Sequence, residues 1–125
     1  MPELSWVKWE PRAWLSSPEI RMLSAEDRGH LMDILCTMYC CEGGGGFIAS
    51  PKGKRLTTEQ VCTALHVPAS AIRSILASDA LCEVDGSLHC PKAEAVLARA
   101  MSATRTRQAA GRKGAAGRWG GKNEV

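Results

Sequence analysis

Residues 57–90 read TTEQVCTALHVPASAIRSILASDALCEVDGSLHC, and this stretch decides the fold. Its first part predicts a helix that begins at Thr57 or Thr58, because Gln60 stands three residues after Thr57, as a capping box requires. The helix is expected to end before Pro68, since the residue that precedes a proline is pushed out of helical geometry.

A second helix is expected directly after that break, from Pro68 to Ser78. Its apolar residues Ile72, Ile75 and Leu76 recur at the i, i+3 and i+4 spacing of one helix face. Proline is tolerated in the first turn of a helix, so Pro68 can open this helix. Two short helices joined by so tight a turn are typical of a helix-turn-helix.

A β-hairpin is expected next, because Asp85-Gly86 lies between two short runs of residues, 82–84 and 87–89, that can form strands. An Asp-Gly pair in this setting is the strongest short hairpin signal that a sequence offers. Helix, turn, helix and hairpin is the order of a winged helix. The sequence therefore predicts a mostly α fold with a small β-hairpin (α+β), of the winged helix-turn-helix type.

The central core helix is expected from Ala25 to about Cys41, with Ser24 as its cap. Gly29 inside this helix suggests a close approach of another backbone. Short strands are expected at residues 4–10 and 47–49. The apolar stripe of the core helix, at i, i+3, i+4, i+7 and i+8, consists of Leu31, Ile34, Leu35, Met38 and Tyr39.

Charge divides the chain into a mildly acidic body and a basic end, although the whole carries only +3. Residues 1–98 hold 9 Lys and Arg against 12 Asp and Glu, which gives −3. Residues 99–125 hold 7 Lys and Arg against 1 Glu, which gives +6. Such asymmetry favours a basic arm that binds a polyanion, most often a nucleic acid, and the alternative is a solvated tail that only aids solubility.

A last helix is expected from Lys92 to Met101, and its apolar stripe fades near Thr104. The remaining sequence has no pattern that could form a core. We therefore expect a winged-helix domain over residues 1–104 and a flexible basic C-terminal tail over 105–125.

Several short motifs occur in a familiar order along the chain. They are Leu23-Ser24-x-Glu26-x-x-Gly29, Ile34-Leu35, the glycine-rich loop, the helix centred on Leu65, Asp85-Gly86-x-Leu88-His89 and Gly117-Arg118-Trp119. Together they resemble the phage and prophage proteins of the DUF1376 type. The resemblance implies a winged-helix module like those at the N-termini of phage replication initiators and replisome organisers, at work in the cytoplasm of a bacterial host cell.

The candidate nucleic-acid contacts lie on the second helix and on the basic tail. On the helix, Arg73 can pair with guanine, while Ser70 and Ser74 can hold phosphates. On the tail, the residues that can neutralise phosphates or stack on a base are Arg99, Arg105, Arg107, Arg112, Lys113, Arg118 and Trp119. The expected partner is DNA, single- or double-stranded, with RNA as an alternative.

A second class of function stays open, because Glu83 and Asp85 make the hairpin acidic and Arg73 is the one cation of its helix. In this alternative, the chain is a protein-interaction module that docks on a host nucleic-acid-handling complex, such as a defence complex, and inhibits it. The tryptophan-rich start of the chain, with Trp6, Trp9 and Trp14, is expected to cap the core, and the alternative is that an exposed tryptophan there anchors such a partner.

Metal binding and catalysis find little support in the sequence. The six cysteines and three histidines include only Cys36-x3-Cys40 near a zinc-ligand spacing, so we expect buried free thiols in a reducing compartment, without metal or other cofactor. No GxSxG or HExxH motif occurs, and neither an enzyme nor a small-molecule substrate is expected. No apolar segment is long enough to cross a bilayer, so no membrane partner is expected.

Overall fold

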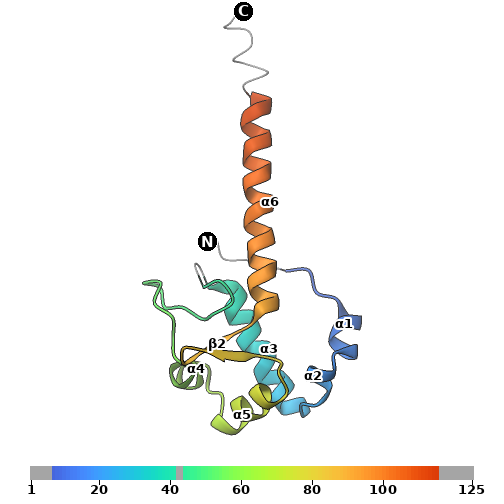
Figure 1. Cartoon of the computed structure of the whole chain (residues 1–125), viewed down its shortest axis with the longest axis vertical. Helices are drawn as coiled ribbons and strands as arrows, with labels where there is room; N and C mark the ends of the chain where they lie inside the picture. The colour runs from blue at the N-terminus through green and yellow to red at the C-terminus, as the bar shows by residue number, and fades with distance from the viewer. Residues whose placement is uncertain (1–6, 42–43, 116–125) are drawn as a thin grey trace, which may run out of the picture.

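The computed structural model describes residues 7–41 and 44–115, with side chains as far as residue 111. This part of the chain is mostly helical with one small antiparallel hairpin, as predicted (Figure 1). The elements are α1 (Pro11–Ser16), α2 (Pro18–Arg21), α3 (Ala25–Cys40), α4 (Thr58–Leu65), α5 (Ala69–Ala77), β1 (Cys82–Val84), β2 (Ser87–His89) and α6 (Pro91–Ala115).

Helix α3 is the centre of the core, as its apolar stripe predicted. Leu31, Ile34 and Met38 are buried, and Leu35 and Tyr39 pack against the same cluster from its edge. The helix contacts both α5 and α6. It begins where the sequence indicated, because the Ser24 hydroxyl accepts a hydrogen bond from the Asp27 N–H.

The predicted pair of helices after the loop is also present. Both bonds of the capping box are formed at the start of α4, between Thr57 and Gln60. The helix ends at His66, whose backbone is left-handed with φ of 56°. Pro68 is the N-cap of α5, which turns Ile72 and Ile75 into the core.

The hairpin follows the predicted Asp-Gly turn. Asp85 and Gly86 have φ of 50° and 78°, the positive values that a type I′ turn needs. This two-residue turn pairs Val84 with Ser87 and, at the far end, Cys82 with His89. The Thr58 N–H donates to the Gly86 carbonyl, which holds the turn against the start of α4.

Two predicted strands do not occur in the described part of the chain. Residues 7–10 form no strand and lead into α1, while residues 4–6 lie outside the described part of the chain. Near 47–49 there is only an isolated bridge between Ala49 and Arg55. A strand needs a partner of several residues, and this loop instead turns back on itself between Ser50 and Lys54.

The close approach expected at Gly29 occurs elsewhere. A Cβ atom added at Gly29 would meet nothing within 4 Å. At Gly46, which has φ of +89°, it would lie 2.8 Å from the carbonyl oxygen of Cys90 and 3.0 Å from Nε2 of His89. The glycine that allows close packing is therefore in the loop after α3, at its contact with the end of β2.

The prediction that the last helix ends near Met101 was wrong, because α6 runs to Ala115. The residues after Thr104 include Ala, Arg and Gln, which favour helix, and extending an existing helix is far easier than starting one. The expected boundary at 104/105 thus falls inside a continuous helix. Residues 116–125 of the expected tail lie outside the described part of the chain.

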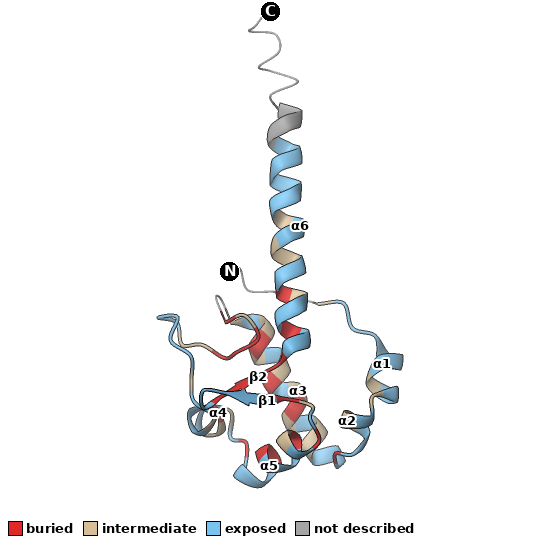
Figure 2. Cartoon of the chain, in the orientation of Figure 1, coloured by how far each residue is buried: buried red, intermediate tan, exposed pale blue. Residues whose placement is uncertain are grey.

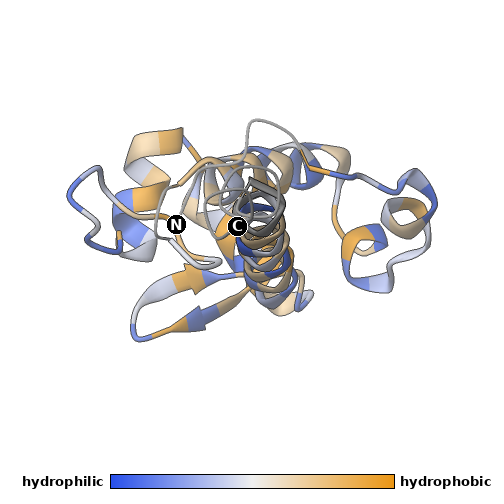
Figure 3. Cartoon of the chain, turned by 90° about the horizontal axis from the view of Figure 1, so that it is seen from above, coloured by the Kyte–Doolittle hydropathy of each residue, from blue (hydrophilic) through white to orange (hydrophobic). Residues whose placement is uncertain are grey.

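Helix α6 projects from the body for most of its length. Its buried positions lie near its start, where Ala93 and Leu97 join the core, and from there to residue 111 it is mostly exposed (Figure 2). At 1.5 Å per residue its 25 residues span about 37 Å. Seen along α6, the α1–α2 arm and the hairpin lie on opposite sides of this helix (Figure 3).

Two glycines allow a matched test of the Gly46 contact. Gly46→Ala and Gly53→Ala both force alanine into a left-handed backbone, but only Gly46 has atoms within 4 Å of the added Cβ. We expect Gly46→Ala to lower the free energy of unfolding by about 1–3 kcal/mol more than Gly53→Ala, as overpacking does. Urea denaturation of the two variants measures the difference, and equal losses would contradict the packing described here.

Candidate nucleic-acid interface

The outer face of α5 carries the three polar residues predicted for it. Ser70, Arg73 and Ser74 are all exposed, while Ile72 and Ile75 hold the opposite face in the core. The Ser74 hydroxyl donates to the carbonyl oxygen of Ser70 at 3.1 Å. Its one proton is therefore already used, so Arg73 and Ser70 are the donors of this face that are better placed for a phosphate.

The hairpin beside α5 is acidic, as the sequence indicated. Asp85 is exposed at the turn, and Glu83 is exposed on β1. The Glu83 carboxylate accepts a hydrogen bond of 2.7 Å from the Thr58 hydroxyl, which fixes its negative charge near the start of α4. A phosphate backbone that approached along the hairpin would meet these charges unfavourably.

The basic residues of α6 divide into three groups. Arg105 and Arg107 are exposed, and because they are two residues apart they leave the helix on roughly opposite sides. Arg99 is exposed too, but it lines a groove near Tyr39 on the body. For Arg112 and Lys113 only the helical backbone is described, and Arg118 and Trp119 lie outside the described residues.

The structure does not bring the two predicted sets of contacts together. In Figure 1, α5 lies at the lower end of the body, and α6 leaves the body in the opposite direction. Arg73 is therefore remote from Arg105 and Arg107, so the α5 face and the projecting helix form two separate surfaces.

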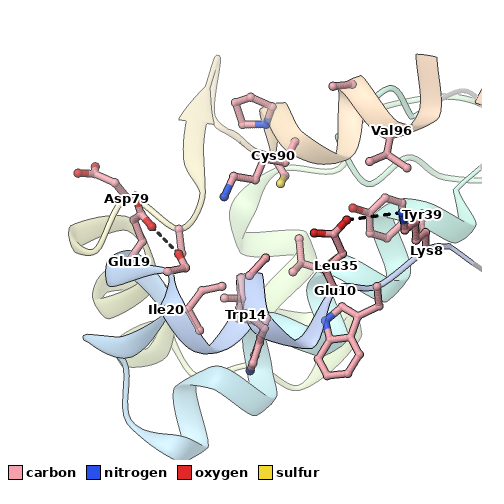
Figure 4. Close-up of a pocket in the computed structure, with 18 of the residues that line it drawn as sticks. Lys8, Glu10, Trp14, Glu19, Ile20, Leu35, Tyr39, Asp79, Cys90 and Val96 are labelled. Atoms are coloured by element: carbon pink, nitrogen blue, oxygen red, sulfur yellow. Dashed lines mark hydrogen bonds and ion pairs between the residues drawn. The ribbon is translucent and has the colours of Figure 1, made fainter. Parts of the chain in front are cut away.

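A large groove lies between the α1–α2 arm, α3 and α6 (Figure 4). It has a volume of about 1020 Å³ and an apolar wall to which Trp14, Leu35 and Val96 contribute. Lys8 and Glu10 form an ion pair of 3.7 Å on the segment that precedes α1. The groove is thus a hollow between the arm and the body.

The tryptophans predicted to cap the core behave differently from one another. Trp14 packs partly buried against the core, as expected. Trp9 is 56% exposed, with its ring 6.5 Å from that of Trp14. Trp6 lies outside the described residues. Trp9 thus lines the groove and leaves most of its ring available to solvent.

Tyr39 lies where α3 borders the groove. Burial raises the pKa of its phenol above the ordinary value, and the cysteine Cys90 adds to that effect, while the Arg99 guanidinium opposes it. The neutral phenol is therefore the form that the folded protein favours.

The expectation of buried thiols was wrong for most of the cysteines. Cys90 is buried, Cys41 and Cys62 are intermediate, and Cys36, Cys40 and Cys82 are exposed. Partial burial raises the pKa of the Cys62 thiol. Among the residues that the structure describes, no group of three or more His, Cys, Asp or Glu side chains could hold a metal ion.

One cluster was missed by sequence reasoning. Cys82 and His89 face each other across the hairpin, with 3.7 Å between Sγ and Nδ1, and Nε2 of His89 lies 2.8 Å from Oε2 of Glu94. Nothing in the sequence pattern connects Glu94 with the hairpin. The two-residue turn at Asp85-Gly86 was the available signal, because it fixes Cys82 opposite His89.

No protein-family model matches the chain, and neither does any curated protein or solved structure. None of the described helices is both long enough and apolar enough to span a membrane. Function is therefore inferred from the geometry of the described residues.

The raised pKa of Tyr39 predicts a pH effect on stability. Below pH 9 the phenol is neutral in both states, whereas above its ordinary pKa of 10.0 the unfolded chain ionises first. The wild type should then lose stability relative to Tyr39→Phe as the pH rises past 10. Urea denaturation of both proteins at several pH values from 8 to 11 measures this, and a constant difference over the whole range would contradict it.

Proposed function

We propose that this chain is a non-enzymatic nucleic-acid-binding protein in which α6 supplies most of the binding energy. The observation that carries the proposal is the projection of α6, with Arg105 and Arg107 exposed on two sides of a helix clear of the body. Cations on two sides of one rod can contact phosphates on both walls of a groove or along a single strand.

Electrostatics supports the same assignment. The net charge of −3 over residues 1–98 repels phosphates, whereas the +6 over 99–125 attracts them. Binding through α6 keeps the acidic body at a distance from the nucleic acid. The affinity would then depend steeply on salt and weakly on base sequence.

We further propose that the body is a winged helix. Its support is the order of α3, α4, α5 and the β1–β2 hairpin, with only residues 66–68 between α4 and α5. In that fold α5 would be the recognition helix. Its exposed face offers Arg73 as the one cation, so we assign it a secondary contact with phosphate or guanine.

The biological setting rests on the resemblance to phage and prophage DUF1376-type proteins, which remains a prediction. On that basis, the protein would bind DNA during phage replication or its regulation in the cytoplasm of a bacterial host. RNA is the other polyanion that α6 could accept.

A charge-matched pair of variants tests the role of α6. Arg105→Ala/Arg107→Ala removes two exposed cations of α6, and Lys52→Ala/Lys54→Ala removes two exposed cations of the loop after α3. We expect the first variant to reduce the salt slope of binding by about 1.8 on duplex DNA and about 1.4 on single strands, at about 0.9 and 0.7 per phosphate contact, and the second to leave it unchanged. Fluorescence anisotropy on labelled single- and double-stranded DNA across a salt series measures the slopes.

Equal effects of the two double variants would show that only net charge matters, which would contradict a specific contact by α6. Absence of binding at low salt would reject the proposal altogether.

In the same assay, Arg73→Ala should weaken binding to preferred sequences more than to others if α5 reads bases.

A second candidate function is favoured by the apolar groove and its surroundings. Trp9, Leu15 and Met22 are 56%, 63% and 72% exposed, and large exposed apolar side chains are typical of protein interaction sites. In this candidate the arm and groove dock on a host nucleic-acid-handling complex and inhibit it.

Purification from a nuclease-treated bacterial extract tests that candidate. A host complex that this protein inhibits should co-purify with the wild type in stoichiometric amount. It should no longer co-purify with Trp9→Ala. Val84→Ala is the control, because Val84 is also an exposed apolar residue but lies on the hairpin. Equal retention by both variants would place the contact away from the groove.

A further inference from the structure

Three side chains from three elements form a connected row at the base of the hairpin. Cys82 lies on β1, His89 is its partner on β2, and Glu94 lies in the first turn of α6. The thiol sulfur is 3.7 Å from Nδ1 of His89, and Nε2 of the same ring is 2.8 Å from the Glu94 carboxylate. The thiol and the carboxylate thus contact the two different nitrogens of one imidazole.

The Glu94 contact decides which nitrogen of His89 carries the proton. An ionised carboxylate can only accept a hydrogen bond, so Nε2 must donate and therefore bears the hydrogen. In the neutral ring Nδ1 is then unprotonated, and its lone pair faces the Cys82 thiol. Proteins activate a thiol by placing a base next to it and a third group that orients the base. Here Cys82 is the nucleophile, His89 is the base and Glu94 orients the base.

The surrounding packing holds the imidazole in this orientation. His89 is only 9% exposed, and its ring centroid lies 4.3 Å from that of Phe47. Gly46 passes so close to Nε2 that a Cβ atom there would be 3.0 Å from it. The base is therefore fixed before any reaction, whereas Cys82 is an exposed residue.

We propose that Cys82, His89 and Glu94 form an activated thiol that undergoes exchange with small disulfides. Nδ1 of His89 takes the proton of the Cys82 thiol, and the thiolate attacks one sulfur of a disulfide RS–SR. A bond forms between Cys82 and that sulfur, the original S–S bond breaks, and RS⁻ leaves and takes the proton from His89. The products are a mixed disulfide at Cys82 and one RSH, and the small disulfide is the oxidant.

The location of Cys82 favours a small reagent. Neither the large groove nor the smaller one beside it is lined by Cys82. An exposed thiol on a hairpin has no walls that would align a peptide or ester for acyl transfer, whereas a small disulfide needs only access to the sulfur. The site is independent of the proposed nucleic-acid function.

Charged groups from two other elements lie close to the ring of His89 or to its stacking partner. Glu94 of α6 is in direct contact with the ring, whereas the Glu83 carboxylate is turned to the Thr58 hydroxyl at the start of α4. Arg55, from the loop after α3, lies with Cζ 3.7 Å from the centre of the Phe47 ring. Glu94 is the group that contacts the ring directly, so its carboxylate orients the imidazole that accepts the proton of Cys82.

The test uses the full chain and bis(2-hydroxyethyl) disulfide, a neutral reagent whose selectivity cannot come from charge attraction. Brief exposure, an acid quench and mass spectrometry of the peptides give the rate at each cysteine. Cys36, an exposed cysteine of α3, is the internal reference. At pH 7 we expect Cys82 to react at least fivefold faster than Cys36, and Glu94→Gln to remove most of that advantage.

The pH profile separates activation from mere exposure. Between pH 6 and 8 the rate at an ordinary thiol rises about tenfold per pH unit, with its thiolate fraction. We expect a shallower rise at Cys82 in the wild type and the ordinary rise in Glu94→Gln. His89→Gln should also show the ordinary rise. If His89→Gln fails to fold, Glu94→Gln still tests the proposal, because the Glu94 side chain is 56% exposed and its replacement does not disturb the core.

Equal rates at Cys82 and Cys36 with the same pH dependence would overturn the proposal. So would an unchanged Cys82 rate and pH profile in Glu94→Gln. Neither readout involves nucleic acid, so failure here and failure of the proposed function can be told apart.

Discussion

The hydrogen bond of 2.9 Å from the Cys90 N–H to the Gly46 carbonyl is the contact on which the arrangement of the rest depends. It joins the loop after α3 to the residue between β2 and α6. Because α6 begins at Pro91, its start is fixed against the core at this point. The close approach requires a glycine, since a side chain at position 46 would collide with the Cys90 carbonyl oxygen.

This junction has two consequences for function. It directs α6 away from the body, so that its arginines are separated from the acidic hairpin and from α5. It also sets His89 between Phe47 and Glu94. The imidazole of His89 is thereby held as a fixed base next to Cys82, its exposed partner across the hairpin. One packing contact thus supports both the basic rod and the Cys82 cluster.

Burial was the property that sequence reasoning judged least well. Cysteines are often buried, yet Cys36 and Cys82 are exposed, because Cys36 lies on the outer side of α3 and β1 is exposed along its whole length. Trp9 is exposed for a related reason, since the arm that carries it touches the body mainly through Trp14, Ile20 and Leu23. Residue type sets only a tendency toward burial or exposure. The side chains that pack around a residue in the folded chain decide whether it is buried.

The sequence by itself determined the features that depend on a few neighbouring residues. The capping box of α4, the stripe of α3, the Asp85-Gly86 turn and the exposed face of α5 with Arg73 were all readable, because helical and strand periodicity and turn chemistry act within about four residues. Only the tertiary structure decided the separation of Arg73 from Arg105, the placing of Arg99 at the groove, and the meeting of His89 with Glu94. These depend on how distant segments pack against one another, and local periodicity carries no information about that packing.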